Sequence, residues 1–156
     1  MNLRACNLAV MVCLLVGISV GQSAASKSAT DHSGRYSFLQ DGEDVQLNQS
    51  GTTIDGYVTR LGTSDSDRDS VLEHVFTKAS LDGDKLSFST KPVHAVWYEF
   101  KGRIERGAAK TRAEDGYYQI VGTLTEHTQK DGKEAGARSR QVTLKLFADE
   151  AEAPRK

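Results

Sequence analysis

Two histidines, His74 and His94, are the residues of this sequence best suited to chemistry. A histidine side chain can donate or accept a hydrogen bond near neutral pH, ligate a metal or act as a general base. His94 has the same parity as Val96 and Tyr98 in the predicted strand that follows it, so we expect its side chain to face inward with theirs. The alternative is that both histidines are partly buried and satisfied by backbone and hydroxyl groups.

The direction of His74 depends on the turn around Asp82–Gly83, which joins two predicted strands. A three-residue loop with a left-handed glycine places His74 opposite Thr90, with both side chains facing inward. A two-residue turn instead places Val75 and Ala79 beside Leu86 and Phe88. The sequence leaves both registers open. Only the first gathers His74, Thr90 and His94 near one end of the sheet, with Tyr98 deeper.

The sequence predicts no metal, no other cofactor and no catalytic residue. No carboxylate is placed by spacing to complete a metal site with the two histidines. The stretch "DSDRD" repeats half of a calcium loop, but Ser70 stands where the glycine is needed and Phe76 where the bidentate glutamate is needed. There is no nucleophile elbow, no pair of inward carboxylates and no glycine-rich phosphate loop followed by a helix.

Eight short runs rich in Val, Thr, Tyr, Phe and Ile alternate apolar with polar residues and are predicted to be strands. They are Arg35–Gln40, Asp44–Gln49, Thr52–Leu61, Leu72–Leu81, Lys85–Thr90, Ala95–Arg106, Tyr117–His127 and Arg140–Ala148. We therefore predict an all-β fold, a single antiparallel up-and-down meander of about eight strands. A closed β-barrel is favoured because closure removes both exposed edges. The alternative is a β-sandwich.

The first 25 residues have the pattern of a cleaved secretory signal peptide. Arg4 precedes the apolar run Leu8–Val20, and Ser23–Ala25 fits a small-x-small cleavage site. The apolar run is shorter than the ~20 residues of a spanning helix, so we expect no membrane span after cleavage. Cys6 and Cys13 are the only cysteines, and both lie in this segment. The mature chain is therefore expected to be disulfide-free and secreted or periplasmic.

The rest of the chain is expected to hold one domain. Residues 26–33 are predicted to be a flexible leader, 34–148 the β-barrel domain and 149–156 a disordered tail. Removing 25 of the 156 residues leaves 131, enough for one core. Without Arg4 the chain has 19 basic and 21 acidic residues, a net charge of −2. This balance gives no electrostatic reason to expect nucleic acid or an anionic membrane as a partner.

Strand alternation divides the aromatic residues between two faces. Five are predicted to point inward and to line a ligand pocket together with His74, Thr90 and His94: Phe76, Phe88, Tyr98, Phe100 and Tyr118. Trp97 falls on the outer face and Tyr117 on the outer face of the neighbouring strand, so the two are a candidate interaction patch. Alternatively, a loop or the leader covers Trp97, or a bulge near Pro92 turns it inward.

The closed eight-strand meander after a signal peptide resembles the calycin superfamily, which includes the lipocalins and the avidins. The stretch "SGRYSF" is similar to the Gly-x-Trp opening of a lipocalin first strand, with Tyr36 in place of the tryptophan. The lipocalin Thr-Asp-Tyr turn and the pocket tryptophans of avidin are absent. The resemblance is one of architecture, and it carries over no binding residue.

Three functions remain compatible with these patterns. The leading hypothesis is a non-enzymatic barrel that binds a small apolar or amphipathic ligand in its mouth. The second is a protein-interaction or structural module that uses Trp97 and Tyr117 as an anchor. The third is a barrel enzyme of the isomerase or cyclase kind, with His94 or His74 as the base.

Overall fold

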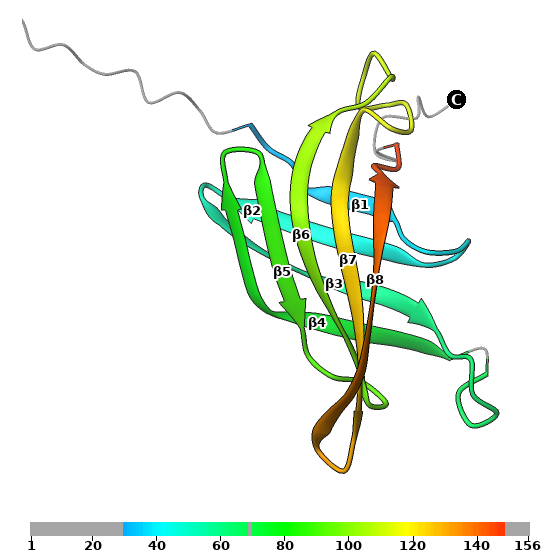
Figure 1. The fold of residues 1–156 in the computed structure, drawn as a ribbon. Helices are drawn as coiled ribbons and strands as arrows, with labels where there is room; N and C mark the ends of the chain where they lie inside the picture. The colour runs from blue at the N-terminus through cyan, green and yellow to red at the C-terminus, as the bar shows by residue number, and fades with distance from the viewer. Residues whose placement is uncertain (1–29, 69, 149–156) are drawn as a thin grey trace, which may run out of the picture.

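The computed structural model describes residues 30–68 and 70–148, and every regular element in this part is a strand (Figure 1). The strands are β1 Gly34–Ser37, β2 Asp44–Ser50, β3 Thr53–Leu61, β4 Val71–Asp82, β5 Lys85–Thr90, β6 Val96–Arg106, β7 Tyr118–Lys130 and β8 Lys133–Lys145. The predicted signal peptide, the first part of the predicted leader (residues 26–29) and the predicted tail lie outside the described residues.

The strands form one antiparallel meander. Their order in the sheet is β1-β2-β3-β4-β5-β6-β7-β8, so each strand pairs with its neighbours in sequence. The prediction of an all-β, up-and-down fold of eight strands is confirmed. The sheet is open and strongly curled: β1, β2 and β3 run across the view in Figure 1, whereas β5 to β8 run along it.

Strand β4 forms the corner between these two groups of strands. Its residues 71–75 pair with β3, and its residues 76–82 pair with β5. The register shifts at a β-bulge between Phe76 and Lys78. A bulge bends its strand and increases the local twist. The two halves of the sheet therefore face each other across a core.

The two ends of the sheet meet at one isolated bridge, between Tyr36 of β1 and Leu146. Beside it the Phe147 N–H donates to the Arg35 carbonyl at 2.8 Å. Because β1 has four residues and β8 has thirteen, this contact does not continue along β8. The sheet is therefore a half-barrel with an open edge, not the fully closed barrel that the edge argument favours. Exposed charged residues line β8, and they disfavour pairing of this open edge with a strand of another molecule.

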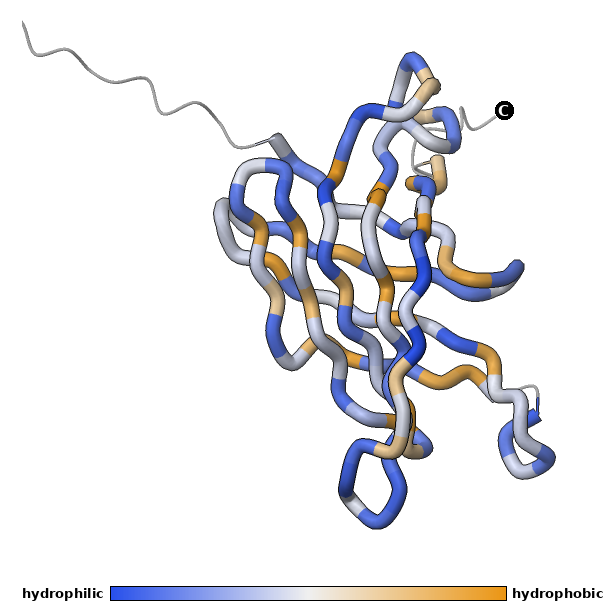
Figure 2. Tube along the Cα trace, in the orientation of Figure 1, coloured by the Kyte–Doolittle hydropathy of each residue, from blue (hydrophilic) through white to orange (hydrophobic). Residues whose placement is uncertain are grey.

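The inward set predicted from alternation forms the core. On the β6–β8 side, the buried side chains are Tyr98, Phe100, Ile104, Tyr118, Ile120, Leu124 and Leu144. Val45, Leu47 and Val58 face them from β2 and β3 and are fully buried. Figure 2 shows hydrophobic and polar residues alternating along these strands. Each such side chain removed from water contributes about 1.5–3 kcal/mol to folding.

The β7–β8 hairpin is longer than the sequence predicts. Residues 128–139 are expected to form a loop, but they continue both strands to a two-residue turn at Asp131 and Gly132. Both turn residues have positive φ, 52° and 74°, as an Asp-Gly hairpin turn requires. The loop prediction is wrong because residues 133–140 are all exposed, so no apolar alternation marks the strand.

The segment just before β1 closes one end of the half-barrel, which we call the leader end. The His32 N–H donates to Gln49 Oε1 at 2.9 Å, and Arg112 Nη2 donates to the Ser33 carbonyl at 2.7 Å. The His32 ring packs edge-on against Tyr118, with 4.8 Å between centroids. Residues 30–33 are thus held against the sheet by specific contacts.

A glycine pair in the β6–β7 ladder provides a test of this packing. Gly102 and Gly122 are direct partners, and a Cβ on Gly102 would lie 2.3 Å from the Val121 oxygen and 2.6 Å from Phe100 Cζ. We expect Gly102→Ala to lower the free energy of unfolding by about 1–3 kcal/mol, because the added methyl group overpacks the site. Urea denaturation measures the change.

Gly136→Ala in the β7–β8 hairpin is the matched control. A Cβ at Gly136 would meet only Thr128 Oγ1, at 3.3 Å. Its expected effect is within about 0.5 kcal/mol. Equal losses of stability in the two variants would contradict the close packing at Gly102.

Candidate functional site

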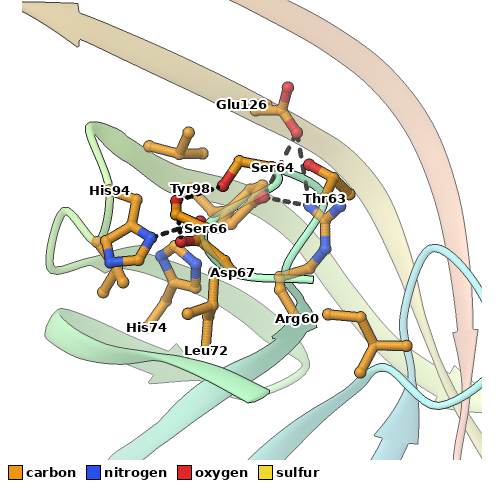
Figure 3. A pocket seen from close by; sticks show the side chains of 13 residues that line it. Arg60, Thr63, Ser64, Ser66, Asp67, Leu72, His74, His94, Tyr98 and Glu126 are labelled. Atoms are coloured by element: carbon orange, nitrogen blue, oxygen red, sulfur yellow. Dashed lines mark hydrogen bonds and ion pairs between the residues drawn. The ribbon is translucent and has the colours of Figure 1, made fainter. Parts of the chain in front are cut away.

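An open pocket of about 740 Å³ lies at the end of the half-barrel away from the leader end. Figure 3 shows the side chains that line it. It is lined by Arg60, Leu61, Thr63, Ser64, Ser66, Asp67, Leu72, His74, Val93, His94, Val96, Tyr98 and Glu126. These residues come from the end of β3, the β3–β4 loop, the start of β4, the β5–β6 connection, β6 and β7. The bend at β4 brings these segments together.

Arg60 and Glu43 form a buried ion pair beside the pocket. Arg60 Nε lies 2.5 Å from Glu43 Oε1, and the Glu43 side chain is fully buried. The same oxygen accepts hydrogen bonds from Gln40 Nε2 at 2.9 Å and from the Leu61 N–H at 3.2 Å. Burial opposes the charge on Arg60, but the hydrogen bond to Glu43 and the nearby acidic groups outweigh it and raise the pKa of Arg60. The guanidinium therefore stays charged.

Arg60 also contacts two side chains on the facing half of the sheet. Its Nη1 donates to the Tyr98 hydroxyl on β6 and lies 3.6 Å from Glu126 Oε2 on β7. Burial raises the pKa of Tyr98 to about 12, so the hydroxyl keeps its proton and donates to Glu126 Oε2 at 3.4 Å. Arg60 thus joins β3 to β6 and β7 at the pocket.

His74 faces inward, but neither predicted register of β4 and β5 is right at the turn. The turn residues are Gly83 and Asp84, and Asp82 pairs with Lys85. The bulge further along β4 then shifts the pairing, so that Phe76 rather than His74 lies opposite Thr90. At the turn the predicted registers fail because the turn residues lie one position later than expected. Further along β4 they fail because each assumes a ladder without a bulge.

The His74 ring is buried in the wall of the pocket. The residue is 2% exposed, and its ring lies edge-on to Tyr98 with 5.1 Å between centroids. Burial, and secondly the charge of Arg60, lowers the pKa of His74, so the ring is neutral near neutral pH. No hydrogen bond reaches its buried Nδ1 from any residue that the structure describes.

His94 lines the pocket from a turn and not from a strand. Val93 and Val96 form an isolated bridge around a two-residue turn of His94 and Ala95. These two residues have φ of 46° and 65°, a conformation uncommon for residues with a side chain. The expectation that His94 has the inward parity of β6 is wrong, because strand parity ends where the chain turns.

Asp67 fixes the position of the His94 ring. His94 Nδ1 lies 2.7 Å from Asp67 Oδ2, which comes from the β3–β4 loop. Hydrogen bonds from Ser66, Ser64 and His94 lower the pKa of Asp67 to about 2, so its carboxylate is ionised at neutral pH. As Figure 3 shows, the contact joins the β3–β4 loop to the β5–β6 connection at the pocket.

Of the eight residues predicted to bind a ligand, His74, His94 and Tyr98 line the pocket. Thr90 lies beneath it: the residue is 2% exposed, and its Oγ1 accepts a hydrogen bond from the Tyr98 N–H at 2.9 Å. Tyr118 lies at the leader end, against His32.

The three predicted phenylalanine liners pack on one another instead of lining this pocket. Phe76 stacks on Phe88 with 4.3 Å between centroids, and Phe88 stacks on Phe100 with 5.3 Å. Phe88 and Phe100 belong to the buried core, where they are 4% and 1% exposed. The inward parity of these residues was sufficient to place them in the core but not to place them at the mouth.

The structure does not bring Trp97 and Tyr117 together into one patch. Trp97 is half-buried and stacks on His127 of β7, with 4.8 Å between centroids. Tyr117 packs under the Arg106 guanidinium, 3.5 Å from its ring centroid, at the other end of the same strand pair. Arg106 lies nine positions after Trp97 along β6, a span of roughly 30 Å. Its cross-strand neighbour therefore partly covers Trp97.

Sequence reasoning missed Glu43, Arg60 and Glu126. All three resemble ordinary surface charges when the sequence is considered one strand at a time. A signal was nevertheless present, because Arg60 has the inward parity of Val58 and Glu126 has that of Leu124. An inward charge near a strand end marks the mouth of a curled sheet when a partner faces it.

Comparison with known proteins identifies no relative: no family model, no curated protein and no solved structure matches the chain. In residues 30–68 and 70–148, no three His, Cys, Asp or Glu side chains are grouped so that they could hold a metal. The same residues include no helix with the length and apolar character to cross a membrane. Fold and site together define a small all-β half-barrel with a partly polar, partly apolar pocket at one end.

The buried ion pair predicts a large loss of stability when one partner is neutralised. Glu43→Gln leaves the Arg60 charge without its closest partner, so we expect the free energy of unfolding to fall by about 3 kcal/mol. Asp65→Asn is the control, because Asp65 pairs with Arg68 on the surface and its side chain is 96% exposed. That variant should unfold like the wild type in urea. Similar behaviour of the two variants would contradict a structural role for the Glu43–Arg60 pair.

The burial of His74 predicts a loss of stability in acid. Because the pKa of His74 is below its ordinary value of 6.5 in the fold, the unfolded chain binds more protons as the pH falls below 6.5. The free energy of unfolding should therefore decrease between pH 7.5 and pH 5.5, and His74→Gln should reduce this decrease. His32, whose pKa burial also lowers, accounts for a remaining part. An unchanged pH dependence in His74→Gln would refute the assignment.

Proposed function

We propose that this protein binds a small amphipathic ligand in the pocket formed by β3, β4, β6 and β7. The observation that carries the proposal is the mixed character of the pocket. Leu72, Val93 and Val96 offer an aliphatic surface, while charged and hydroxyl side chains occupy the rest of the wall. A volume of about 740 Å³ lies within the range of small-molecule sites.

The polar groups of the pocket are held in place before any ligand arrives. Arg60 is fixed by Glu43, and the Tyr98 ring packs against Phe38 with 5.5 Å between centroids. The left-handed backbone at His94 and Ala95 supports the same proposal, since strained residues of this kind cluster at functional sites. A preorganised wall favours binding because little conformational entropy is lost when the ligand enters.

As part of the proposal, the protein acts outside the cytoplasm and is related in architecture to the calycins. The N-terminal sequence has the pattern of a secretory signal peptide. An eight-stranded antiparallel meander curled around a pocket agrees with a calycin-like barrel opened along one edge.

Native mass spectrometry of protein purified from its own periplasm or culture medium tests the proposal. We expect a bound small molecule in the wild type and its loss in Leu72→Trp, whose larger side chain fills the pocket. Val75→Trp is the matched control, because Val75 lies on the outer face of the same strand and is 51% exposed. A ligand-free wild type, or equal retention in the two variants, would argue against the pocket.

A barrel enzyme of the isomerase or cyclase kind is a second candidate, favoured by the contact between His94 Nδ1 and Asp67. A carboxylate bound to one ring nitrogen orients a histidine so that the other can act as a base. The copurified molecule distinguishes the two functions. A binding protein returns it chemically unchanged after prolonged incubation, whereas an enzyme converts it at a rate that His94→Gln abolishes.

A further inference from the structure

The charges of the pocket are predominantly negative. Its lining residues include one cation, Arg60, and two carboxylates, Asp67 and Glu126. Glu43, which pairs with Arg60 beside the pocket, is a third carboxylate, so these groups carry three negative charges against one positive charge. A ligand that carries a carboxylate or a phosphate would therefore be repelled by the uncompensated negative charge of this pocket.

Arg60 is poorly available as an anchor for an anionic ligand. Its Nε is taken by Glu43 at 2.5 Å, and its Nη1 donates to the Tyr98 hydroxyl and contacts Glu126. Its guanidinium also lies over the rings of Phe38 and Tyr98, at 5.7 and 5.5 Å from their centroids. The side chain is only 16% exposed. Turning it toward a ligand would break contacts that hold the two halves of the sheet together.

The His74 ring adds an unpaired polar atom, Nδ1, to the same wall of the pocket. A neutral imidazole has one N–H and one nitrogen lone pair. Backbone hydrogen bonds at Lys91 and Val96 raise the pKa of His74 against the larger effect of burial. In the part of the chain that the structure describes, nothing pairs with the buried Nδ1. This residue is 98% buried and lines the pocket independently of the acidic groups.

From these contacts we propose that the ligand of this pocket is an amphipathic amine. Its protonated nitrogen is held by the carboxylates of Glu126 and Asp67, and the unpaired Nδ1 of His74 lies in the same wall. Its aliphatic part lies against Leu72, Val93 and Val96. The proposal rests on the binding function proposed above and names the head group that this wall recognises.

Three probes of equal chain length test the head group: n-hexylamine, 1-hexanol and hexanoate. Each is titrated into the ¹⁵N-labelled protein at pH 7.5 and low salt, and the backbone amide signals of pocket residues are followed by NMR. We expect hexylamine to bind at least about tenfold more tightly than hexanol, because hydrogen bonds to charged groups are strong, and hexanoate to bind most weakly. Added salt should weaken the binding of hexylamine far more than that of hexanol.

Two carboxylate variants locate the ammonium group. Glu126→Gln and Asp67→Asn should each weaken hexylamine binding by about tenfold and leave hexanol binding unchanged. Glu134→Gln and Asp65→Asn are the controls, because these carboxylates are exposed and outside the pocket. Unchanged hexanol binding also shows that a variant is folded. If the loss of the Glu126 charge disturbs Arg60, the Asp67→Asn variant alone tests whether a pocket carboxylate binds the ammonium group.

The outcomes separate the head group from the binding function. Pocket signals that respond to hexanol or hexanoate as strongly as to hexylamine overturn the amine and leave the binding function in place. A response to hexylamine that both pocket variants retain also overturns it. If none of the three probes moves the pocket signals, the amine is again refuted. Native mass spectrometry of the purified protein then tests the binding function independently of the amine.

Discussion

A single extra residue in β4, Thr77, divides the meander into two halves that face each other. Before the bulge, β4 continues the β1–β3 half of the sheet, and after it β4 pairs with β5. Without this bend, β3 would not face β6 and β7, and Arg60 would not reach Tyr98 and Glu126. The bulge also restores the inward direction of His74. The core and the pocket therefore depend on the same local irregularity.

The pocket end of the half-barrel is stabilised by polar contacts rather than by apolar packing alone. Burying Glu43 and Arg60 carries a desolvation cost, which the ion pair and the hydrogen bonds to Glu43 Oε1 offset in part. The other carboxylate oxygen, Oε2, is buried and has no partner among the residues that the structure describes. At the leader end, by contrast, residues 30–33 cover the sheet. One end is thus closed by the chain itself, while the other keeps an opening with fixed polar groups, as a binding site requires.

Part of the candidate site was predictable from single residues, and part was not. Tyr98 and its inward direction follow from the regular alternation of β6, which the structure confirms. His74 and His94 were selected for their chemistry and do line the pocket, although the predicted register and the predicted parity are both wrong. The inward parity of Arg60 and Glu126 was visible in the sequence. Their partnership was not, because it joins residues 66 positions apart through a bend that no turn signal marks.

The sequence by itself determined the fold class, the number of strands, their antiparallel order and most of the core. Those features depend on local alternation and turn residues, which act between neighbours in the chain. The tertiary structure alone decided the bulge in β4, the length of the β7–β8 hairpin, the open edge and the composition of the pocket. A bulge shifts every later side chain by one position, and a buried charge is stable only beside its partner. Both effects arise from contacts between distant strands, so alternation within one strand does not reveal them.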